Sequence, residues 1–314
     1  MDSKIIVIAI GGNSLIEDNK NVTVSTQYAA AAKTAHHIAK LVKAGHSVVI
    51  AHGNGPQVGY ILRRSEYSTK ILHPVPLDSC VADTQGAIGY QLQMALDNEF
   101  TKMGLKASVA TIVTQVEVDP DDPSFKNPTK PIGSFMDEET AMMHKKESGW
   151  DVVEDAGRGW RRVVPSPKPK SIIELDAVDK LINAGVIVIA GGGGGIPVVR
   201  NADGTLSGKE AVIDKDLAAA LLAKHLKADY FVISTAVEKV AINFNKPNQM
   251  DLGQINLTEA RRYMAEGHFA PGSMLPKVQA MVDFVETTGN VGLITDPAHI
   301  YDAIYKDAGT KIVK

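Results

Sequence analysis

The sequence is poor in several features that would each point to a particular class of protein. Its 314 residues contain one cysteine, Cys80, so the chain cannot close an internal disulfide and fits a reducing compartment. The formal net charge of −3 provides no overall field that would attract nucleic acid or an anionic membrane. No apolar run approaches the length of a membrane span, and the first run is too short for a secretory signal. We therefore expect a cytoplasmic protein that binds neither nucleic acid nor membrane.

Common nucleotide and metal signatures are also missing. The pair Gly208-Lys209 resembles the end of a P-loop, but Asp203 stands where the first glycine of that motif belongs. The stretch 53–58 begins like a dinucleotide fingerprint and then has Val58 in place of the third glycine. The nine histidines show no metal-ligand spacing, and no Ser-His or His-Asp pattern indicates a nucleophile or a general base. These absences disfavour a Rossmann dehydrogenase and assign no protein ligand to a metal.

What the chain does contain is a set of short apolar runs that end in glycine and asparagine. Residues 5–10 precede Gly11-Gly12-Asn13, residues 48–51 precede His52-Gly53-Asn54-Gly55, and residues 186–190 precede the five glycines 191–195. Such β-branched runs are typical of buried strands in a parallel sheet. Ligands of these sheets collect at the carboxyl ends of the strands, where glycine leaves main-chain N–H groups free to bind anions. The pattern predicts a protein that handles phosphate.

Strand-like and helix-like segments alternate along most of the chain. Beyond those three runs, strands are expected at 107–118, 230–234, 240–244 and 291–294, and helices at 27–44, 84–103, 175–184, 215–226 and 276–286. Repeated alternation predicts an α/β fold in which helices cover both faces of a mostly parallel sheet.

Residues 119–170 interrupt this alternation. They hold seven of the fifteen prolines and both tryptophans, which is typical of a functional excursion rather than a simple connection. We expect a small lid or subdomain here, with a helix near 137–147. Its arginines are expected to brace it by pairing with Glu154 or Asp155, although they could also close over an anion; they are Arg158, Arg161 and Arg162.

Two lysines occupy unusual positions at the starts of expected helices. Lys277 follows Pro276, and Lys215 lies between Asp214 and Asp216, where the positive end of the helix dipole disfavours a cation. An anion nearby would offset that cost. We hypothesise that Lys215 and Lys277 face the same phosphate and that Asp216 orients them; the simpler alternative is that both lysines point into water.

Eight ordered blocks of sequence closely resemble the carbamate kinases of the amino-acid kinase family. They are Gly11-Gly12-Asn13, 52–59, 76–82, 127–133, 154–161, 192–198, 211–216 and 267–277. Each short block is a weak signal, but together they run in order over nearly the whole chain.

The resemblance implies a fold, a reaction and partners. The fold would be a three-layer αβα sandwich with a mostly parallel central sheet and a small protruding subdomain at about 119–170. The reaction would be phosphoryl transfer between ADP and carbamoyl phosphate, giving ATP and carbamate with Mg²⁺, in nitrogen catabolism such as arginine metabolism. The single domain, 1–314, would bind carbamoyl phosphate in its 1–200 half and nucleotide in its 201–314 half, and would form a homodimer.

The resemblance also implies roles for individual residues. Many amino-acid kinases carry a lysine where this chain has Ala9. Carbamate kinases resemble this chain in lacking that lysine, and Lys130 in the excursion is the expected substitute. Mg²⁺ would be held mainly by phosphates and water. The nucleotide region departs from the common Thr-Gly-Val-Asp pattern, since this chain has Thr-Ala-Val-Glu at 235–238. The implied residues are Lys130, Lys215, Asp216 and Lys277 for catalysis; Gly11, Gly12, Asn13, Gly53, Asn54, Gly192 and Gly193 for carbamoyl phosphate; and Ser234, Ala236, Val237, Met274 and Lys277 for nucleotide.

Two alternatives stay open. One is an amino-acid kinase that phosphorylates the carboxylate of an amino acid, against which Ala9 and the block around Lys130 argue. The other is a non-catalytic relative that binds nucleotide or carbamoyl phosphate as a sensor. Replacing Lys277 by alanine would distinguish the enzyme from the sensor. For an enzyme, turnover should collapse while the protein still folds and binds nucleotide.

Overall fold

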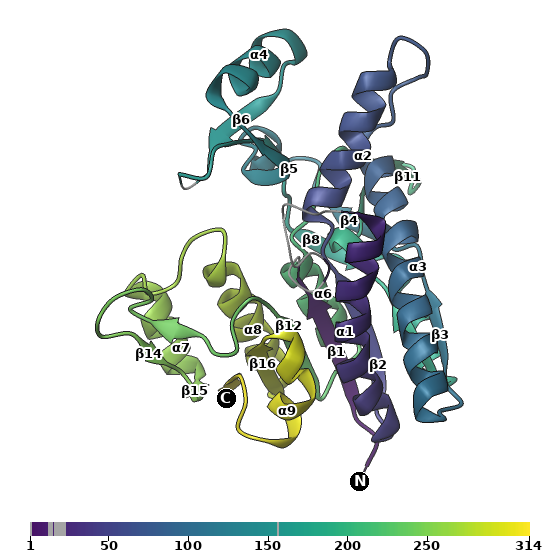
Figure 1. Ribbon diagram of the computed structural model, residues 1–314, viewed down its shortest axis with the longest axis vertical. Helices are drawn as coiled ribbons and strands as arrows, with labels where there is room; N and C mark the ends of the chain where they lie inside the picture. Colours follow the sequence, from purple (N-terminus) through teal and green to yellow (C-terminus); the bar gives the residue numbers. More distant parts are fainter. Residues whose placement is uncertain (1, 12–14, 16–22, 156) are drawn as a thin grey trace.

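The centre of the molecule is an eight-stranded sheet (Figure 1). The computed structural model describes residues 2–11, 15, 23–155 and 157–314. Six neighbouring strands run parallel, while β17 and β15 at one edge run in the opposite direction. From that edge the strands are β15 (Gln254–Asn256), β17 (Thr310–Val313), β16 (Val291–Thr295), β12 (Tyr230–Ser234), β1 (Ile5–Ile10), β2 (Ser47–His52), β9 (Val186–Ile189) and β3 (Ser108–Thr111).

The central strands are apolar throughout because helices cover both of their faces. Along β1, Ile6, Ile8 and Ile10 enter one core, whereas Val7 and Ala9 enter the other. Each buried aliphatic side chain of this size contributes about 1.5–3 kcal/mol relative to an exposed one. The predicted three-layer αβα sandwich is confirmed. Its first helical layer contains α1 (Val24–Lys43), α3 (Leu77–Met103) and α9 (Ile300–Tyr305), and its second contains α5 (Leu175–Asn183), α6 (Lys215–His225), α7 (Leu257–Ala265) and α8 (Met274–Thr288).

The structure has helices beyond those expected from the sequence. Helices α2 (Gly55–Ser68), α7 and α9 were not predicted, and α3 begins at Leu77 rather than at residue 84. Gly55 and Pro56 read as helix breakers, yet proline suits the first turn of a helix, where its missing N–H is not needed. The first N–H of α3 is satisfied from far along the chain, since Leu77 N donates to Glu210 at 3.2 Å.

Two predicted strands are wrong in extent. The run 107–118 divides into β3 of the central sheet and β4 (Gln115–Val118) of a second sheet, because the chain leaves one sheet for the other around Thr114. The run 240–244 keeps only β13 (Ala241–Ile242), paired with β14 (Met250–Asp251), since Asn243 turns to a φ of 53°. The second sheet orders as β11 (Leu206–Gly208), β10 (Ile196–Arg200), β4 and β8 (Pro169–Ile172).

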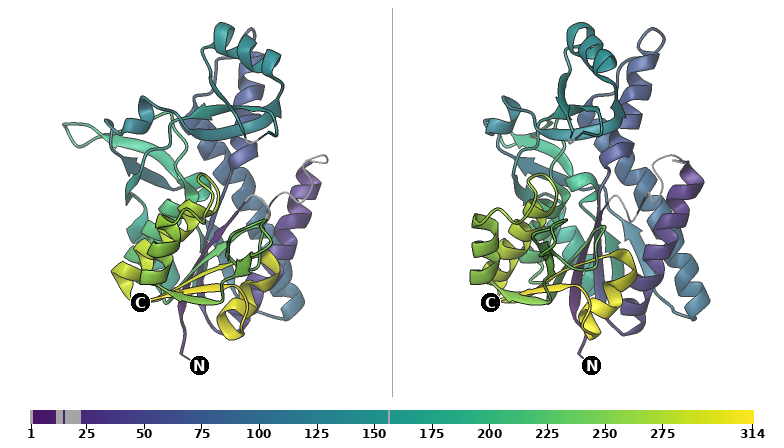
Figure 2. Two further views of the ribbon diagram at one scale, coloured as in Figure 1. Left: turned by 90° about the vertical axis from the view of Figure 1, so that its left-hand side faces the viewer. Right: turned by 60° about the vertical axis from the view of Figure 1, so that its left-hand side comes forward.

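A small subdomain projects from the sandwich beside the outer half of α2 (Figures 1 and 2). It consists of a three-stranded sheet in the order β5 (Lys130–Met136), β7 (Trp160–Val164) and β6 (Asp151–Glu154), together with α4 (Glu138–Ser148). The subdomain covers fewer residues than the predicted segment 119–170, because β8 belongs to the second sheet and not to the subdomain. Across the ranges that the structure describes, no helix is both long and apolar enough to cross a bilayer.

Candidate active site

The parallel sheet brings the loops after four neighbouring strands to one edge, and three of these loops are rich in glycine. β12, β1, β2 and β9 are direct neighbours, so the loops after them meet where their carboxyl ends lie. Gly11 N donates to Ser234 O at 3.1 Å, and Gly53 N donates to Ile10 O at 3.0 Å. The turns after β1 and β2 are thereby each bonded to the end of the neighbouring strand.

Asp216 is the centre of a buried ion-pair group at this edge. Lys215 Nζ donates to Asp216 Oδ1 at 2.5 Å, and Lys277 Nζ donates to Asp216 Oδ2 at 2.8 Å. The side chains of Lys215, Asp216 and Lys277 are only 13%, 3% and 17% exposed. The structure thus brings together the three residues at the starts of α6 and α8 that the sequence hypothesis joined.

The protonation states of this group follow from burial and from the charges within it. Burial alone would raise the pKa of Asp216, but the ammonium groups of Lys215 and Lys277 outweigh it and lower that pKa. At Lys277 burial opposes the charge, yet Asp216 prevails and raises the pKa. At Lys215, the more enclosed of the two, burial dominates and lowers the pKa. The carboxylate is therefore anionic and accepts from the amines of both lysines.

The third predicted lysine reaches the same place from the subdomain. Lys130 is the first residue of β5, and its Nζ donates to Asp214 Oδ2 at 2.6 Å. Asp214 is the N-cap of α6, where its Oδ1 accepts from Asp216 N at 2.9 Å. Burial would raise the pKa of Asp214, but the charge of Lys130, with those of Lys215 and Lys277, holds the pKa of this carboxyl far below its usual value. Sequence reasoning assigned no role to Asp214, although it stands in one of the eight ordered blocks.

Glycines at the ends of β1 and β2 leave space for the stem of Lys215. A β-carbon on Gly53 would stand 3.1 Å from Lys215 Cδ, and one on Gly11 would stand 3.9 Å from Lys215 Cε. Gly11 and Gly53, predicted to bind carbamoyl phosphate, therefore also admit the lysine. Their contact with substrate stays a prediction, and Gly12 and Asn13 lie outside the described residues.

The five-glycine run after β9 packs against the loop after β2. A β-carbon on Gly192 would overlap the ring of His52, and one on Gly193 would overlap the amide of Asn54. Asn54 is buried, and its Nδ2 donates to Thr84 Oγ1 at 2.9 Å. Close packing is thus one reason for glycine here, and binding of substrate by Asn54, Gly192 and Gly193 stays a prediction.

The predicted nucleotide residues divide between two places. Ala236, Val237 and Met274 line a cavity of about 540 Å³, a size typical of small-molecule pockets. Ser234 is fully buried and is not part of the cavity lining, and Lys277 lies one helical turn beyond Met274 with its amine on Asp216. Lys239 and Lys246 also line the cavity and would suit an anionic ligand, while Glu266 and His268 in the same lining contact each other at 3.1 Å.

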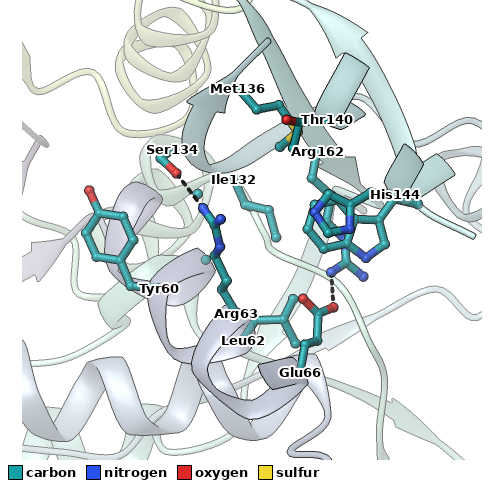
Figure 3. Close-up of a pocket in the computed structure, with 13 residues that line it drawn as sticks. Tyr60, Leu62, Arg63, Glu66, Ile132, Ser134, Met136, Thr140, His144 and Arg162 are labelled. Carbon is teal, nitrogen blue, oxygen red and sulfur yellow. Dashed lines mark hydrogen bonds and ion pairs between the residues drawn. The ribbon is translucent and has the colours of Figure 1, made fainter. Parts of the chain in front are cut away.

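A tight joint between α2 and the subdomain sets the position of β5 (Figure 3). Arg162 donates to Glu66 at 2.6 Å and lies over the ring of Trp150, which in turn stacks on His144. Arg63 adds a longer contact of 3.5 Å with Ser134 Oγ. The space between these groups holds only about 30 Å³, so the joint leaves no room for a nucleotide.

The subdomain arginines mostly follow the prediction. Arg158 and Arg161 pair with Asp155 at 2.9 and 3.5 Å, which confirms that they brace the excursion. Arg162 differs, because it crosses to Glu66 on α2 instead of pairing within the subdomain. Cys80 is buried, and burial raises the pKa of its thiol to about 11, as befits a core residue.

Comparisons with known proteins place the chain in a family. A family model described as the amino acid kinase family matches residues 4–296. The chain is 50% identical to a carbamate kinase of Lentilactobacillus hilgardii, over 98% of this chain and 97% of that one. It is 49% identical to a carbamate kinase-like protein of Escherichia coli, over 99% of each.

Solved structures agree with this placement. The chain matches a carbamate kinase from Giardia lamblia bound to citric acid with a TM-score of 0.95 and 42% identity, over 99% of both chains. It matches the same protein bound to AMP-PNP with a TM-score of 0.92 and 43% identity, again over 99% of both chains. The chain therefore belongs to the amino acid kinase family, among its carbamate kinases and carbamate kinase-like proteins.

Proposed function

We propose that the chain is a carbamate kinase that transfers a phosphoryl group between carbamoyl phosphate and ADP. The observation that carries the proposal is the pair of buried lysines, Lys215 and Lys277, held on opposite oxygens of Asp216. Lys130 faces the same helix start from the subdomain. Three cations converging on the ends of parallel strands suit a reaction whose substrates are anions.

The chemistry requires charge neutralisation more than acid–base catalysis. In the direction of ATP formation, an oxygen of the ADP β-phosphate attacks the phosphorus of carbamoyl phosphate. The bond from that phosphorus to the carbamoyl oxygen breaks, its electron pair remains on carbamate, and no proton has to move. Such transfers depend on alignment and on stabilising the charge of the migrating group. Lys215, Lys277 and Lys130 supply that charge, and main-chain N–H groups of the glycine turns add donors.

Lys130 also fits the family pattern at β1. Ala9 is fully buried in the core, so β1 offers no charge where many amino-acid kinases have a lysine. Lys130 instead provides a charged side chain from the subdomain, and its Nζ lies 2.6 Å from Oδ2 of Asp214, the N-cap of α6. This arrangement favours carbamate kinase over relatives that phosphorylate the carboxylate of an amino acid.

We assign ADP to the cavity beside Ala236 and Met274 and carbamoyl phosphate to the glycine turns after β1 and β2. Mg²⁺ would enter with the nucleotide. Among the described residues, no group of three or more acidic, His or Cys side chains could hold a metal ion, and both oxygens of Asp216 already accept from lysines. Phosphate oxygens and water are suitable Mg²⁺ ligands, and the bound ion would neutralise phosphate charge. From the family resemblance we also propose a cytoplasmic homodimer working in nitrogen catabolism, such as arginine breakdown.

The experiment that tests the proposal measures ATP formation from ADP, Mg²⁺ and carbamoyl phosphate through hexokinase and glucose-6-phosphate dehydrogenase. Enzyme-dependent ATP formation above a no-enzyme control supports it. A folded protein that binds ADP but makes no ATP would point to the sensor alternative. ATP-dependent phosphorylation of glutamate or aspartate, without any activity on carbamoyl phosphate, would point to another amino-acid kinase.

A further inference from the structure

Asp214 uses its two carboxylate oxygens for two different parts of the molecule. Oδ1 caps α6 by accepting from Asp216 N at 2.9 Å, with a weaker contact to Leu217 N at 3.4 Å. Oδ2 accepts from Lys130 Nζ at 2.6 Å, across 84 positions of sequence. A single carboxylate thus joins the subdomain to the helix that carries Lys215 and Asp216.

The backbone that presents Asp214 is itself fixed on both sides. Ala211, Val212 and Ile213 are all at least 98% buried. Val212 N donates to Pro165 O at 3.0 Å, next to the end of β7, and a β-carbon on Gly194 would overlap Ile213 O. The position of Asp214 is therefore fixed by contacts of the preceding residues with the end of β7 and with the glycine run.

Lys130, in contrast, needs an external partner to hold its ammonium group in place. A lysine side chain has roughly 2 kcal/mol of rotamer entropy, and this one remains 28% exposed at the start of an edge strand of the subdomain sheet. The other two lysines share Asp216, so Asp214 is the carboxylate that the structure gives to Lys130.

The charge of Asp214 would be a disadvantage if it did nothing else. It places a negative charge beside the site of two anionic substrates, where it lowers the attraction for phosphate. Capping α6 does not require that charge, because asparagine or serine caps a helix about as well. The ion pair with Lys130 is the feature that needs a carboxylate.

We propose that Asp214 is a positioning residue that holds Lys130 over the migrating phosphoryl group. It acts through Lys130 and does not touch substrate. The three lysines are then set relative to one another by a single helix start, with Asp214 holding one and Asp216 the other two. This inference rests on the proposed function, which it deepens.

The first test compares Asp214→Asn, Lys130→Met and the double variant in the ATP-forming assay. Asp214→Asn retains the cap and the side-chain size, and misplacing a catalytic group by about 1 Å costs roughly 100-fold in rate. We expect kcat to fall about 10-fold to 100-fold, without any rise in the KM for ADP. In the Lys130→Met background the Asp214→Asn change should then have no further effect on kcat. Multiplicative losses in the double variant would assign Asp214 a purely structural role and overturn the proposal.

The matched control is Asp137→Asn, which alters another N-cap aspartate. Asp137 caps α4 by accepting from Thr140 N at 2.7 Å and is exposed on the subdomain. This variant should keep wild-type kcat. A loss equal to that of Asp214→Asn would show that any weakened cap near the subdomain suffices, against the proposal.

A second measurement does not depend on turnover. Acetic anhydride labelling, followed by peptide mass mapping, compares Lys130 with the exposed Lys168 in each variant. Ion pairing shields an amine from acylation, so Lys130 should label several-fold faster in Asp214→Asn and unchanged in Asp137→Asn. Unaltered labelling of Lys130 in Asp214→Asn would overturn the proposal, even for a protein without carbamate kinase activity.

Discussion

The stem of Lys215 lies against the backbone of Gly53, so closely that any β-carbon there would meet Lys215 Cδ at 3.1 Å and Cε at 3.4 Å. The glycine cluster after β2 thus shapes the path of Lys215, which we propose to be catalytic, as well as offering N–H groups. A separation of 3.1 Å is tighter than nine in ten real β-carbon contacts, so the side chain of Lys215 has to give by a few tenths of an ångström.

We predict that Gly53→Ala lowers kcat about 10-fold to 100-fold because it pushes Lys215 out of line with the phosphoryl group. The control is Gly55→Ala, two residues along, where a β-carbon has nothing within 4 Å and the backbone is helical. Steady-state rates and thermal melting of both variants provide the measurement. Equal activities would show that Lys215 tolerates the displacement.

Removing the charge of Asp216 should destabilise the protein. In Asp216→Asn the ammonium groups of Lys215 and Lys277 stay buried without their shared anion. Breaking a buried ion pair on one side costs about 3–5 kcal/mol, whereas an exposed pair contributes at most about 1 kcal/mol. Urea unfolding should therefore show a loss of about 3 kcal/mol for Asp216→Asn. The control, Asp176→Asn, removes an exposed partner of Lys180 and should change the free energy of unfolding very little.

Sulfate provides a further check on the same variant. If the two lysines of Asp216→Asn lack an anion, sulfate should raise its melting temperature more than that of the wild type. Identical sulfate responses would mean that the lysines find another partner in the variant.

Lys277→Met should remove turnover while leaving the nucleotide bound. Its amine lies on Asp216, away from the residues that line the proposed nucleotide cavity, although its helix contributes Met274 to that cavity. Losing one donor to a transition-state charge costs about 100-fold to 1,000-fold in kcat. Isothermal titration with ADP should give a Kd near that of the wild type, and Lys180→Met serves as the surface control. Turnover at the wild-type rate would refute the central catalytic assignment.

The family and the fold could be predicted from sequence because their signals are local or ordered. Apolar runs such as 5–10 are long enough to reveal buried strands, and the eight blocks retain their order along the chain. Lys215 and Lys277 could be joined because each stands against the dipole at a helix start. The structure shows that Asp216, which the sequence hypothesis gave as the residue that orients them, is the carboxylate that offsets this cost.

Other features depend on contacts that no local pattern contains. Lys130 and Asp214 meet across 84 positions, and Arg162 crosses 96 positions to reach Glu66 instead of its sequence neighbours. The division of the run 107–118 between two sheets at Thr114 could not be predicted for a related reason. Its β-branched neighbours favour a strand in either sheet, and the turn is fixed by Gln85, whose Oε1 accepts from Thr114 N at 2.8 Å.

The joint between α2 and the subdomain gives a fourth prediction. A β-carbon on Gly59 would overlap the Cα and N of Gly133, and backbone atoms cannot rotate away as a flexible side chain can. Gly59→Ala should therefore displace β5 together with Lys130 and lower kcat by about 100-fold. The control is Gly86→Ala on α3, where a β-carbon has nothing within 4 Å. A Gly59→Ala variant with normal kcat would show that Lys130 is positioned independently of this joint.

Acid should destabilise the protein through His52, which lies under the glycine run. Burial lowers the pKa of His52 from 6.5 to about 4, so the folded state keeps the ring neutral. The stability that this provides is complete above the unfolded pKa of about 6.5 and is lost as the pH falls toward 4. Between pH 7.5 and pH 5.0 the loss should be about 2 kcal/mol, because the unfolded chain binds a proton that the folded chain refuses.

Replacing the histidine isolates its share of this pH dependence from that of the other titratable groups. His52→Gln should lose about 2 kcal/mol less than the wild type between those two pH values, whatever its stability at pH 7.5. His73→Gln alters an exposed ring and should keep the wild-type dependence. Urea unfolding of the three proteins at both pH values provides the measurement. Parallel losses in all three would mean that His52 accepts a proton in the folded state, and that the packing of the glycine run against it opens in acid.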